Sequence, residues 1–524
     1  MRPVAQRLGW VLIVLGVATA AAAVVVSASA AAPLQVTVNT KLDIVGTANS
    51  NTHPDCHDPC SLRKAVQFAN SRRTGGTIIN LPAGDYVLTE PVPADADTAA
   101  GGDLELVVDG IQIVGAGAAT TIIEQSHADA HDVQDRVFDI QSTVRISGVT
   151  VRGGTAVADP SYPGNVGGGI LVYYGSLDLS NSVVTGNRAI LGSDPQAVGG
   201  YGGGIALMGS FRPPSILHDV TISNNVADAS GAGVYASTPN TIYNSTIASN
   251  HCLSLCDGGG IYATSELHLL NDTIDGNNAQ RGGGLYSYSG PTSATNVTFS
   301  SNSLNPIILG QARPRAARNV ATPTPLRGAA VMAEAFGSTS ATLTSSIVNG
   351  NPLDECAQIE DTTSPKGPPL ASGGSNIDDG LSCLFTAAGD KQATSAGLGP
   401  LADNGGATRT RAIGPTSPAA DAVAGPCPPP SRDQRGILRA SAAARTGTKC
   451  DIGAFEYQAA DTTPSPSPSP SFTVQDVVIY VPYVPTLPRA GITPKTTGTP
   501  PLLALGLGLL LLAGGAAALW RSPR

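Results

Sequence analysis

Charged and aromatic residues are scarce in this chain of 524 residues. Asp, Glu, Lys and Arg together make up 13% of it, and Phe, Trp and Tyr make up 4%. The net charge is −9, and the chain contains no basic run. Because phosphate contacts need clustered Lys and Arg, these figures argue against a nucleic-acid-binding protein. Gly, by contrast, occurs 61 times. This composition is typical of an extended stack of strands with small side chains, and not of a compact helical enzyme.

The chain begins with the features of an export signal. Arg2 and Arg7 precede an apolar run at 8–26, and residues 28–30 (Ala-Ser-Ala) have the small side chains that signal peptidase reads. We therefore predict a signal peptide over residues 1–30 and a body outside the cytoplasm. Its removal takes two arginines away and changes the net charge from −9 to −11.

An uncharged segment at 501–520 lies at the other end. As a helix it would be about 30 Å long, enough to cross a bilayer, and 521–524 would form a cytoplasmic tail. A Pro- and Ser-rich linker at 458–500 precedes it. This linker contains a pentapeptide similar to a sortase sorting signal: Leu487, Pro488, Arg489, Ala490 and Gly491. Two predictions stay open, namely attachment to the cell wall by a sortase and a permanent transmembrane anchor.

All eight cysteines lie in the exported part, which predicts disulfides. Neighbours in sequence suggest the pairs Cys56 with Cys60, Cys252 with Cys256, Cys356 with Cys383, and Cys427 with Cys450. The alternative for the first pair is a metal site, because the spacing of His53, Cys56, His57 and Cys60 suits zinc. The oxidising compartment favours the disulfide. No cofactor is predicted, since the Gly-rich runs are not followed by the Lys and helix of a phosphate-binding loop.

A seven-residue pattern recurs along the middle of the chain: Asn or Asp, two residues, an apolar residue, two more, then Asn. The pattern ends at Asn187, Asn225, Asn250, Asn277 and Asn302, at intervals of 38, 25, 27 and 25 residues. A glycine run, such as 258–260, leads each unit and is followed by apolar alternation. Three short strands per turn of ~25 residues predict an all-β fold, a right-handed parallel β-helix.

The terminal asparagines have two interpretations. Asn adopts left-handed backbone angles easily at a corner, and stacked Asn side chains can hydrogen-bond from turn to turn, so the first is a structural ladder. The second is a polar stripe that binds a ligand. The regular spacing favours the ladder, because every corner must repeat the same backbone geometry.

An active site on the helix would need carboxylates gathered on one face. The best cluster in the sequence is Asp257, Asp272 and Asp275: Asp272 and Asp275 share a turn, and Asp257 lies earlier, near the glycine corner. A weaker one consists of Glu124, Asp132, Asp135 and Asp139. Successive turns show no acidic ladder at either pattern position that could build such a face. Isolated acidic residues on an exposed face are usually solvated, so catalysis is the less favoured hypothesis.

The N-terminal part is expected to close the coil with a helix. Ser61 is a suitable N-cap, and Leu62, Ala65, Val66 and Ala69 share one helical face. Residues 60–65 (Cys-Ser-Leu-Arg-Lys-Ala) resemble the motif of an exported bacterial surface-protein family named for Cys-Ser-Leu-Arg-Glu-Ala, with Lys64 in place of Glu. Residues 433–436 and 450–456 are similar to the closing module of β-helical proteins with variable C-terminal anchors. The resemblance implies a surface protein and transfers no catalytic residue.

Together these features predict the domain order. An N-terminal cap with the first turns spans 33–125, the β-helix 126–355, and the C-terminal turns with a closing module 356–457. The expected function is a non-catalytic adhesin or stalk that binds polysaccharide, the envelope or another cell. The alternative is an anchored polysaccharide lyase or glycoside hydrolase. The expected partners are therefore a glycan or cell surface, the membrane through the C-terminal helix, and a sortase, with no nucleic acid.

Overall fold

The computed structural model describes residues 32–45, 56, 59–72, 76–91, 101–126, 135–156, 165–191, 199–209, 212–253, 256–305, 327–334, 341–352, 354–359, 370–439 and 449–458. The chain divides into two units, Met1–Val477 and Val478–Arg524, and every described residue belongs to the first. The predicted signal peptide, sorting-like pentapeptide and membrane segment lie outside these ranges. Within the described ranges, no helix is long and apolar enough to cross a membrane.

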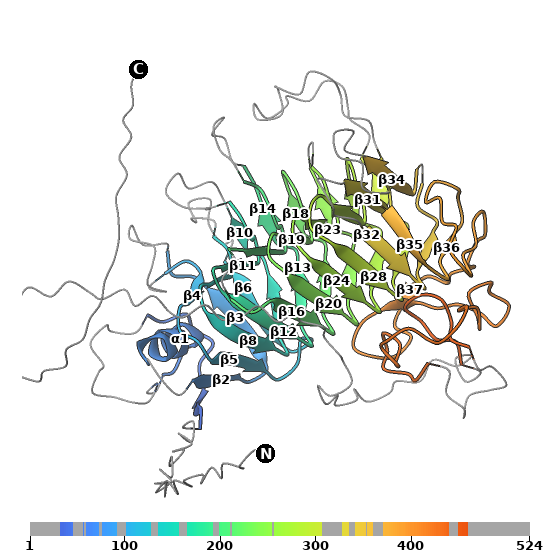
Figure 1. The fold of residues 1–524 in the computed structure, drawn as a ribbon. Coiled ribbons are helices and arrows are strands. Elements are labelled where there is room, and N and C mark those ends of the chain that lie inside the picture. The colour runs from blue at the N-terminus through green and yellow to red at the C-terminus, as the bar shows by residue number, and fades with distance from the viewer. Residues whose placement is uncertain are drawn as a thin grey trace, which may run out of the picture. The chain divides into compact units, whose positions relative to one another are not determined.

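Four parallel sheets run along the coil (Figure 1). Sheet A contains β1 (Leu34–Thr37), β2 (Thr77–Leu81), β5 (Ile111–Gly115), β8 (Thr143–Ser147), β12 (Ser176–Ser180), β16 (Ser215–His218), β20 (Asn240–Tyr243), β24 (Leu267–Leu270), β28 (Thr292–Thr295), β32 (Ala341–Thr344) and β35 (Leu370–Gly374). Sheet B contains β3 (Gly84–Leu88), β6 (Thr121–Gln125), β9 (Thr150–Arg152), β13 (Val183–Thr185), β17 (Thr221–Ser223), β21 (Thr246–Ala248), β25 (Thr273–Asp275), β29 (Thr298–Ser300), β33 (Ile347–Asn349) and β36 (Ile377–Asp378).

Sheet C contains β4 (Leu104–Leu106), β7 (Phe138–Ile140), β11 (Ile170–Tyr173), β15 (Ile205–Met208), β19 (Val234–Ala236), β23 (Ile261–Ala263), β27 (Leu285–Ser287), β31 (Val331–Glu334) and β34 (Cys356–Ile359). Sheet D is narrow and contains β10 (Thr155–Ala156), β14 (Arg188–Ala189), β18 (Val226–Ala227), β22 (His251–Cys252), β26 (Asn278–Ala279) and β30 (Ser303–Leu304).

Each complete turn visits sheets C, A, B and D in that order, and every strand pairs in parallel with its equivalent in the next turn. In β21 and β25, for example, Ile247 pairs with Ile274. Parallel crossovers of this kind are right-handed in nearly all proteins. The right-handed parallel β-helix predicted from the repeat is therefore confirmed. The two-residue strands of sheet D are an addition that the sequence pattern does not reveal.

Alternating side chains build the core, because successive residues of a strand point to opposite faces. The inward positions, such as Ile247 and Ile274, are fully buried in one continuous hydrophobic cluster. The glycine runs allow the close corner between sheets D and C. Gly282 has a φ of 60°, in the left-handed region, and a Cβ on Gly284 would lie 2.6 Å from the carbonyl oxygen of Ala330. Larger residues at these positions would push the turns apart.

Helix α1 (Leu62–Ser71) follows β1 in sequence and packs against β2 and β4. The side chain of Ser61 accepts a hydrogen bond from the backbone N–H of Lys64 at 3.1 Å, as an N-cap does. Leu62, Ala65, Val66 and Ala69 are buried in the same hydrophobic cluster as the strands. The helix thus extends the core of the coil beyond its first strands (Figure 1).

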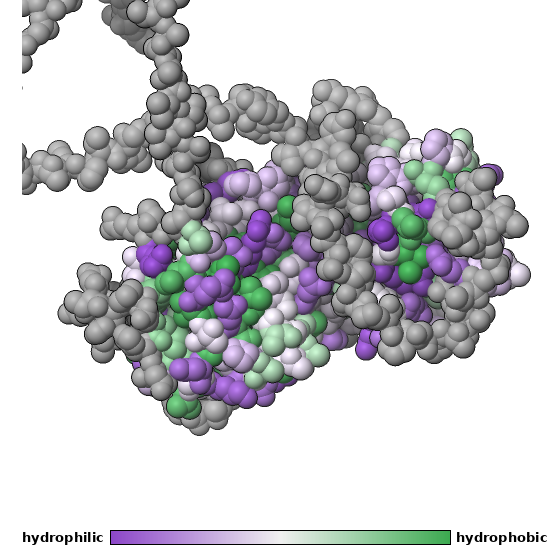
Figure 2. Space-filling view, turned by 90° about the horizontal axis from the view of Figure 1, so that it is seen from below, coloured by the Kyte–Doolittle hydropathy of each residue, from purple (hydrophilic) through white to green (hydrophobic). Residues whose placement is uncertain are grey.

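Residues beyond β36 form a C-terminal module, defined here as 396–439 and 449–457. Its hydrophobic core around Ile413, Val423 and Phe455 also includes Ile347 of β33 and Ile377 of β36. Its only described strands are the short antiparallel pair β37 (Leu401–Ala402) and β38 (Thr410–Arg411). The outer surface is mixed in character. Figure 2 shows one face on which hydrophobic residues gather in the left-hand half, among hydrophilic ones.

Candidate functional site

The repeat asparagines lie in the corner after sheet B, and all five are fully buried. The side-chain Oδ1 of Asn187 accepts from the backbone N–H of Gly154, and each later Oδ1 accepts hydrogen bonds from the preceding asparagine. Asn277, for example, accepts from the backbone N–H of Asn250 at 3.0 Å and from its Nδ2 at 2.9 Å. The left-handed backbone expected at the asparagine belongs instead to the residue before it, such as Gly276 with φ 62° or Ser249 with φ 56°. The preceding residue makes the bend, which lets the amide point into the coil, away from any ligand.

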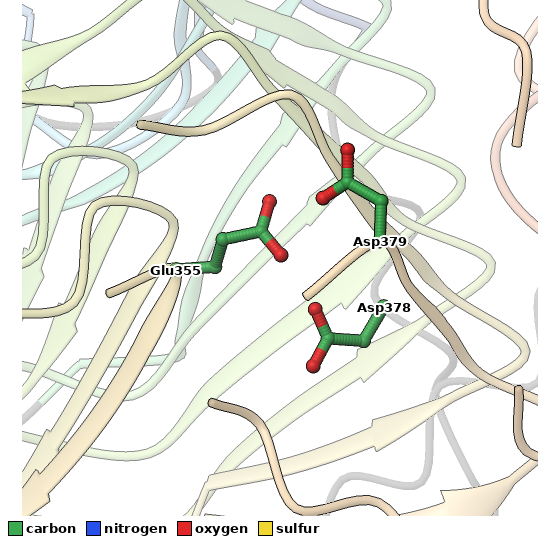
Figure 3. A group of neighbouring side chains, drawn as sticks. All are labelled: Glu355, Asp378 and Asp379. Atoms are coloured by element: carbon green, nitrogen blue, oxygen red, sulfur yellow. The ribbon is translucent and has the colours of Figure 1, made fainter. Parts of the chain in front are cut away.

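Glu355 ends this ladder. Asn351 follows Asn302 in the ladder, and its backbone N–H and Nδ2 both donate to Glu355 Oε1 at 3.2 Å. The carboxyl group thus takes the place that the next amide would occupy. Figure 3 shows Glu355 facing Asp378 and Asp379, and one ligand atom of each lies within 4.8 Å of the others.

Three carboxyl groups so close together need a proton or a cation between them. Burial, together with the hydrogen bonds to Asp378 and Asp379, raises the pKa of Glu355 to about 10. At neutral pH Glu355 is therefore protonated and can donate to an aspartate. The oxygen-only set would also suit a hard cation such as Ca²⁺. Backbone N–H groups of Gly350 and Cys383 already donate to the aspartates, which fits a structural role at the end of the ladder.

Asp257, Asp272 and Asp275, expected as one cluster, are separated by the fold. Asp272 points into the corner between sheets A and B, is fully buried and accepts from the backbone N–H groups of Ser245 and Leu270. Burial raises its pKa well above the ordinary value. Asp275 points outward from β25 and Asp257 lies beside sheet C. The three residues therefore do not form a shared catalytic site, because successive residues of an extended chain point to opposite faces, so that Asp272 and Asp275, three positions apart, face opposite sides.

Asp275 is paired with Arg411 of the C-terminal module, at 2.5 Å between Oδ1 and Nε. Burial raises the pKa of Asp275, and the guanidinium of Arg411 opposes that shift. The pair is buried under the module, so Asp275 is not available to a substrate.

The weaker acidic cluster is also divided. Glu124 pairs with Arg152 on sheet B. Asp139 pairs with Arg136 at 3.0 Å, and Asp135 accepts from the backbone N–H of Asp103 at 3.0 Å. Asp132 lies outside the described residues. Asp103, Arg136 and Asp139 are almost fully buried, so this group is a structural network near the first turns of sheet C.

The cysteines pair as neighbours: Cys56–Cys60, Cys252–Cys256, Cys356–Cys383 and Cys427–Cys450. The predicted disulfides are thus confirmed. The zinc alternative loses both of its sulfur ligands, because a disulfide sulfur is not a thiolate. His53 and His57 lie outside the described residues.

The C-terminal module covers the outer face of sheet B. Gln434 inserts among three threonine side chains: its Oε1 accepts from Thr273 at 2.6 Å, and its Nε2 donates to Thr246 at 3.0 Å and Thr408 at 2.8 Å. The backbone N–H of Ala454 donates to Thr298 at 3.1 Å. Residues about 160 positions apart are joined in this way, and the covered part of the face is closed to ligands.

The outer face of sheet C carries a column of tyrosines that sequence reasoning missed. This tyrosine column consists of Tyr201, Tyr235, Tyr262, Tyr286 and Tyr288. The ring centroids are 4.9 Å apart from Tyr201 to Tyr235, 5.6 Å from Tyr235 to Tyr262, and 6.0 Å from Tyr262 to Tyr288. Tyr286 is fully buried, whereas the other four are partly exposed. A signal was present, since Tyr directly follows the apolar residue after three of the glycine runs.

The charged residues beside this column include Arg281, Asp257 and Glu334. Arg281 donates from Nε and Nη2 to Asp257, at 2.9 and 2.6 Å, and its guanidinium lies 4.9 Å above the ring of Tyr286. The hydroxyl of Tyr286 donates to Glu334. Burial raises the pKa of Asp257, and the hydrogen bonds and charge of Arg281 oppose that shift.

A second group of titratable side chains lies on the outer face of sheet A. His218 Nδ1 is 2.8 Å from Asp219 Oδ2, and its Nε2 is 3.6 Å from Asp178 Oδ1. Its ring stacks on Tyr243 with centroids 4.9 Å apart. Burial alone would lower the pKa of His218, but the hydrogen bonds and charges of Asp178 and Asp219 raise it to about 9. His218 is therefore an imidazolium held between two carboxylates at neutral pH. The sequence does not reveal this group, because its members come from separate turns.

No family model and no curated protein matches the sequence. Solved structures with a similar fold include pectate lyase Pel9A, at 12% identity and a TM-score of 0.39, covering 82% of this chain and 97% of that chain. Pectin methylesterase PemA from Erwinia chrysanthemi has 10% identity and a TM-score of 0.33, covering 70% and 93%. The A-module of mannuronan C-5 epimerase AlgE6 from Azotobacter vinelandii has 11% identity and a TM-score of 0.31, covering 63% and 90%. At these values no site residue is transferred to this chain.

Proposed function

We propose that this protein is an exported, C-terminally anchored surface protein whose β-helix binds a glycan through the tyrosine column. The observation that carries the proposal is the row of four partly exposed tyrosines on successive turns of sheet C. Tyrosine offers a large amphipathic surface and a hydroxyl that both donates and accepts, which suits the recognition of sugars.

The acidic residues favour a binding role over catalysis, because each of them is buried or paired with an arginine. Asp272 is buried in a corner, Asp275 is neutralised by Arg411, and Asp257 is neutralised by Arg281. None of the three keeps the freedom that a general acid or base needs to reach a reacting bond.

The test compares two conservative variants of the full-length protein on a glycan array. Tyr262→Phe removes one hydroxyl from the column and keeps the ring stack. Tyr243→Phe is the matched control, because Tyr243 is a stacked and partly exposed tyrosine on sheet A. We expect Tyr262→Phe to lose several-fold in affinity and Tyr243→Phe to bind like the wild type. Equal binding by all three proteins would refute the proposed site.

The second candidate function is an anchored polysaccharide lyase or glycoside hydrolase. The specific observation in its favour is the group of Asp178, His218 and Asp219, which presents a protonated imidazole between carboxylates on the open face of sheet A. Incubation with polysaccharides and measurement of released oligosaccharides tests it. Products made by the wild type but not by His218→Gln would establish catalysis and displace the binding role.

Anchoring is part of the proposal and is tested on its own. If a sortase acts at 487–491, mass spectrometry of the protein from cells will find Ala490 as the C-terminal residue, linked to cell wall material. Recovery of an intact Arg524 in the membrane fraction would instead establish a permanent transmembrane anchor.

A further inference from the structure

One exposed tyrosine comes from each of four successive turns of the coil. Tyr235 and Tyr262 occupy the same register on β19 and β23, Tyr201 stacks on Tyr235 from the preceding turn, and Tyr288 stacks on Tyr262 from the following one. Stacked strands are about 4.8 Å apart. The ring separations of 4.9, 5.6 and 6.0 Å follow this spacing. Tyr201 and Tyr288 lie outside this register, since Ala206 pairs with Tyr235 and Tyr286 with Tyr262. Their rings nevertheless continue the stack, so the four rings, the exposed row, follow the coil axis over four successive turns.

The stacking decides which part of each ring a ligand can reach. The planes of neighbouring rings in the exposed row differ by only 6–23°, so the faces of the inner rings contact one another. Ring edges remain for a ligand, together with the hydroxyl groups of Tyr201, Tyr235 and Tyr262. Burial raises the pKa of Tyr201, Tyr235 and Tyr262 above the ordinary value, which keeps these hydroxyls protonated and neutral. A complementary ligand carries hydroxyl groups that repeat at nearly the same interval.

The charges beside the row select against an acidic ligand. The guanidinium of Arg281 is already held by Asp257 and lies 3.8 Å from Glu334, at the distance between Nη1 and Oε2. A carboxylate on the ligand would have to displace one of these partners or approach their negative charges. Either change costs free energy, because a partly buried charge that loses its partner remains desolvated.

From these three observations we infer that the ligand is a linear, uncharged glycan that lies parallel to the coil axis and presents about one sugar unit to each turn. A pyranose ring in an extended chain occupies a length close to the ~4.8 Å spacing of the turns, so successive units meet hydroxyls from successive turns. A branched glycan does not present one unit to each turn, and an acidic glycan is disfavoured by the charges beside the row. The inference rests on the proposed glycan-binding function and specifies its ligand class and orientation.

The test is titration calorimetry of the full-length protein with oligosaccharides of two to eight units. The neutral series are cello-, xylo- and manno-oligosaccharides, and the acidic series is oligogalacturonide. We expect the affinity for at least one neutral series to rise by roughly two- to tenfold per added unit, since each unit adds a hydrogen bond. The rise should level off at about three units, one for each of the hydroxyls of Tyr201, Tyr235 and Tyr262, given a turn spacing of about 4.8 Å.

Two variants locate the effect. Tyr235→Phe, in the middle of the row, should flatten the dependence on length without changing the fold, as checked by circular dichroism. Tyr243→Phe on sheet A should leave it unchanged. Oligogalacturonides should bind at least about tenfold more weakly than the neutral chain of equal length.

The outcomes separate this inference from the proposed function. Neutral chains that bind with no dependence on length, or acidic chains that bind as tightly as neutral ones, would overturn the inference and leave a glycan-binding protein. Absence of binding to every series would overturn both.

Discussion

Replacement of Asn277 by alanine tests the structural role of the ladder most directly. In the folded protein, Asn277 Oδ1 accepts from the backbone N–H and the Nδ2 of Asn250, and its own Nδ2 donates to Ile247 and Asn302. The alanine variant removes all four bonds. The backbone N–H of residue 277 keeps its bond to Asn302.

The magnitude follows from what remains unsatisfied. The buried N–H of Asn250 loses the acceptor that Asn277 provides, at a cost of about 1–3 kcal/mol. Asn250 Nδ2 keeps a second acceptor, the carbonyl of Ile222, and Asn302 Oδ1 keeps one donor. The contact that each of these two atoms loses with the side chain of Asn277 costs about 0.5 kcal/mol. We therefore expect Asn277→Ala to lower the free energy of unfolding by about 3 kcal/mol.

Urea denaturation followed by far-UV circular dichroism measures this change, with Asn278→Ala as the matched control. Asn278 is the adjacent residue, is only half-buried, and donates from Nδ2 to Ser303 at 2.9 Å. We expect the control to lose about 1 kcal/mol or less. If Asn277→Ala proves no less stable than Asn278→Ala but loses glycan binding, the ladder interpretation is wrong and the asparagines form a ligand site.

Three further predictions concern charges and the module. The pKa of Glu355 is raised from 4.5 to about 10, so its contribution to stability is fully present below pH 4.5 and is lost as the pH rises through about 10. Glu355→Gln mimics the protonated form. Its urea midpoint should therefore exceed that of the wild type by an amount that grows from pH 5 to pH 9. A calcium-dependent rise in the wild-type midpoint would instead indicate a cation between the carboxylates. The pKa of His218 is raised from 6.5 to about 9, so its contribution to stability is fully present below pH 6.5 and is lost as the pH rises through about 9. NMR titration of the imidazole should show a midpoint near 9. A midpoint at or below 6.5 would contradict the ion pairs. Gln434→Ala leaves buried hydroxyls of Thr246 and Thr273 without this partner and should speed proteolysis within the C-terminal module, whereas unchanged proteolysis would show that Gln434 is dispensable for docking.

Local patterns in the sequence were sufficient for much of the architecture. The glycine run at 258–260 and the alternation after it predict a corner and a strand, because a left-handed bend needs glycine and a half-buried strand alternates. Ser61 and the apolar positions after it predict helix α1 in the same way. These features depend on neighbours within a few residues, which explains why they could be recognised without the structure.

The interpretation of the acidic residues was less successful, for a reason that the fold makes clear. Asp272 and Asp275 are only three positions apart, yet one faces the interior and the other faces the C-terminal module. Proximity in sequence was mistaken for proximity on one face. The group at His218 shows the converse, since Asp178 is 40 positions away and yet lies beside it through the register of β12 and β16.

The sequence by itself determined that the chain coils into a parallel β-helix with paired cysteines, because each turn repeats its own local pattern of corner glycines, inward apolar residues and terminal asparagines. Only the tertiary structure decided which surfaces remain open. The return of Gln434 and Arg411 onto sheet B closes one face, and the stacking of turns aligns tyrosines from four repeats into one row. Both depend on contacts between residues far apart in the chain. The free energy of these contacts comes from burial and strand register, which a local sequence pattern does not reveal.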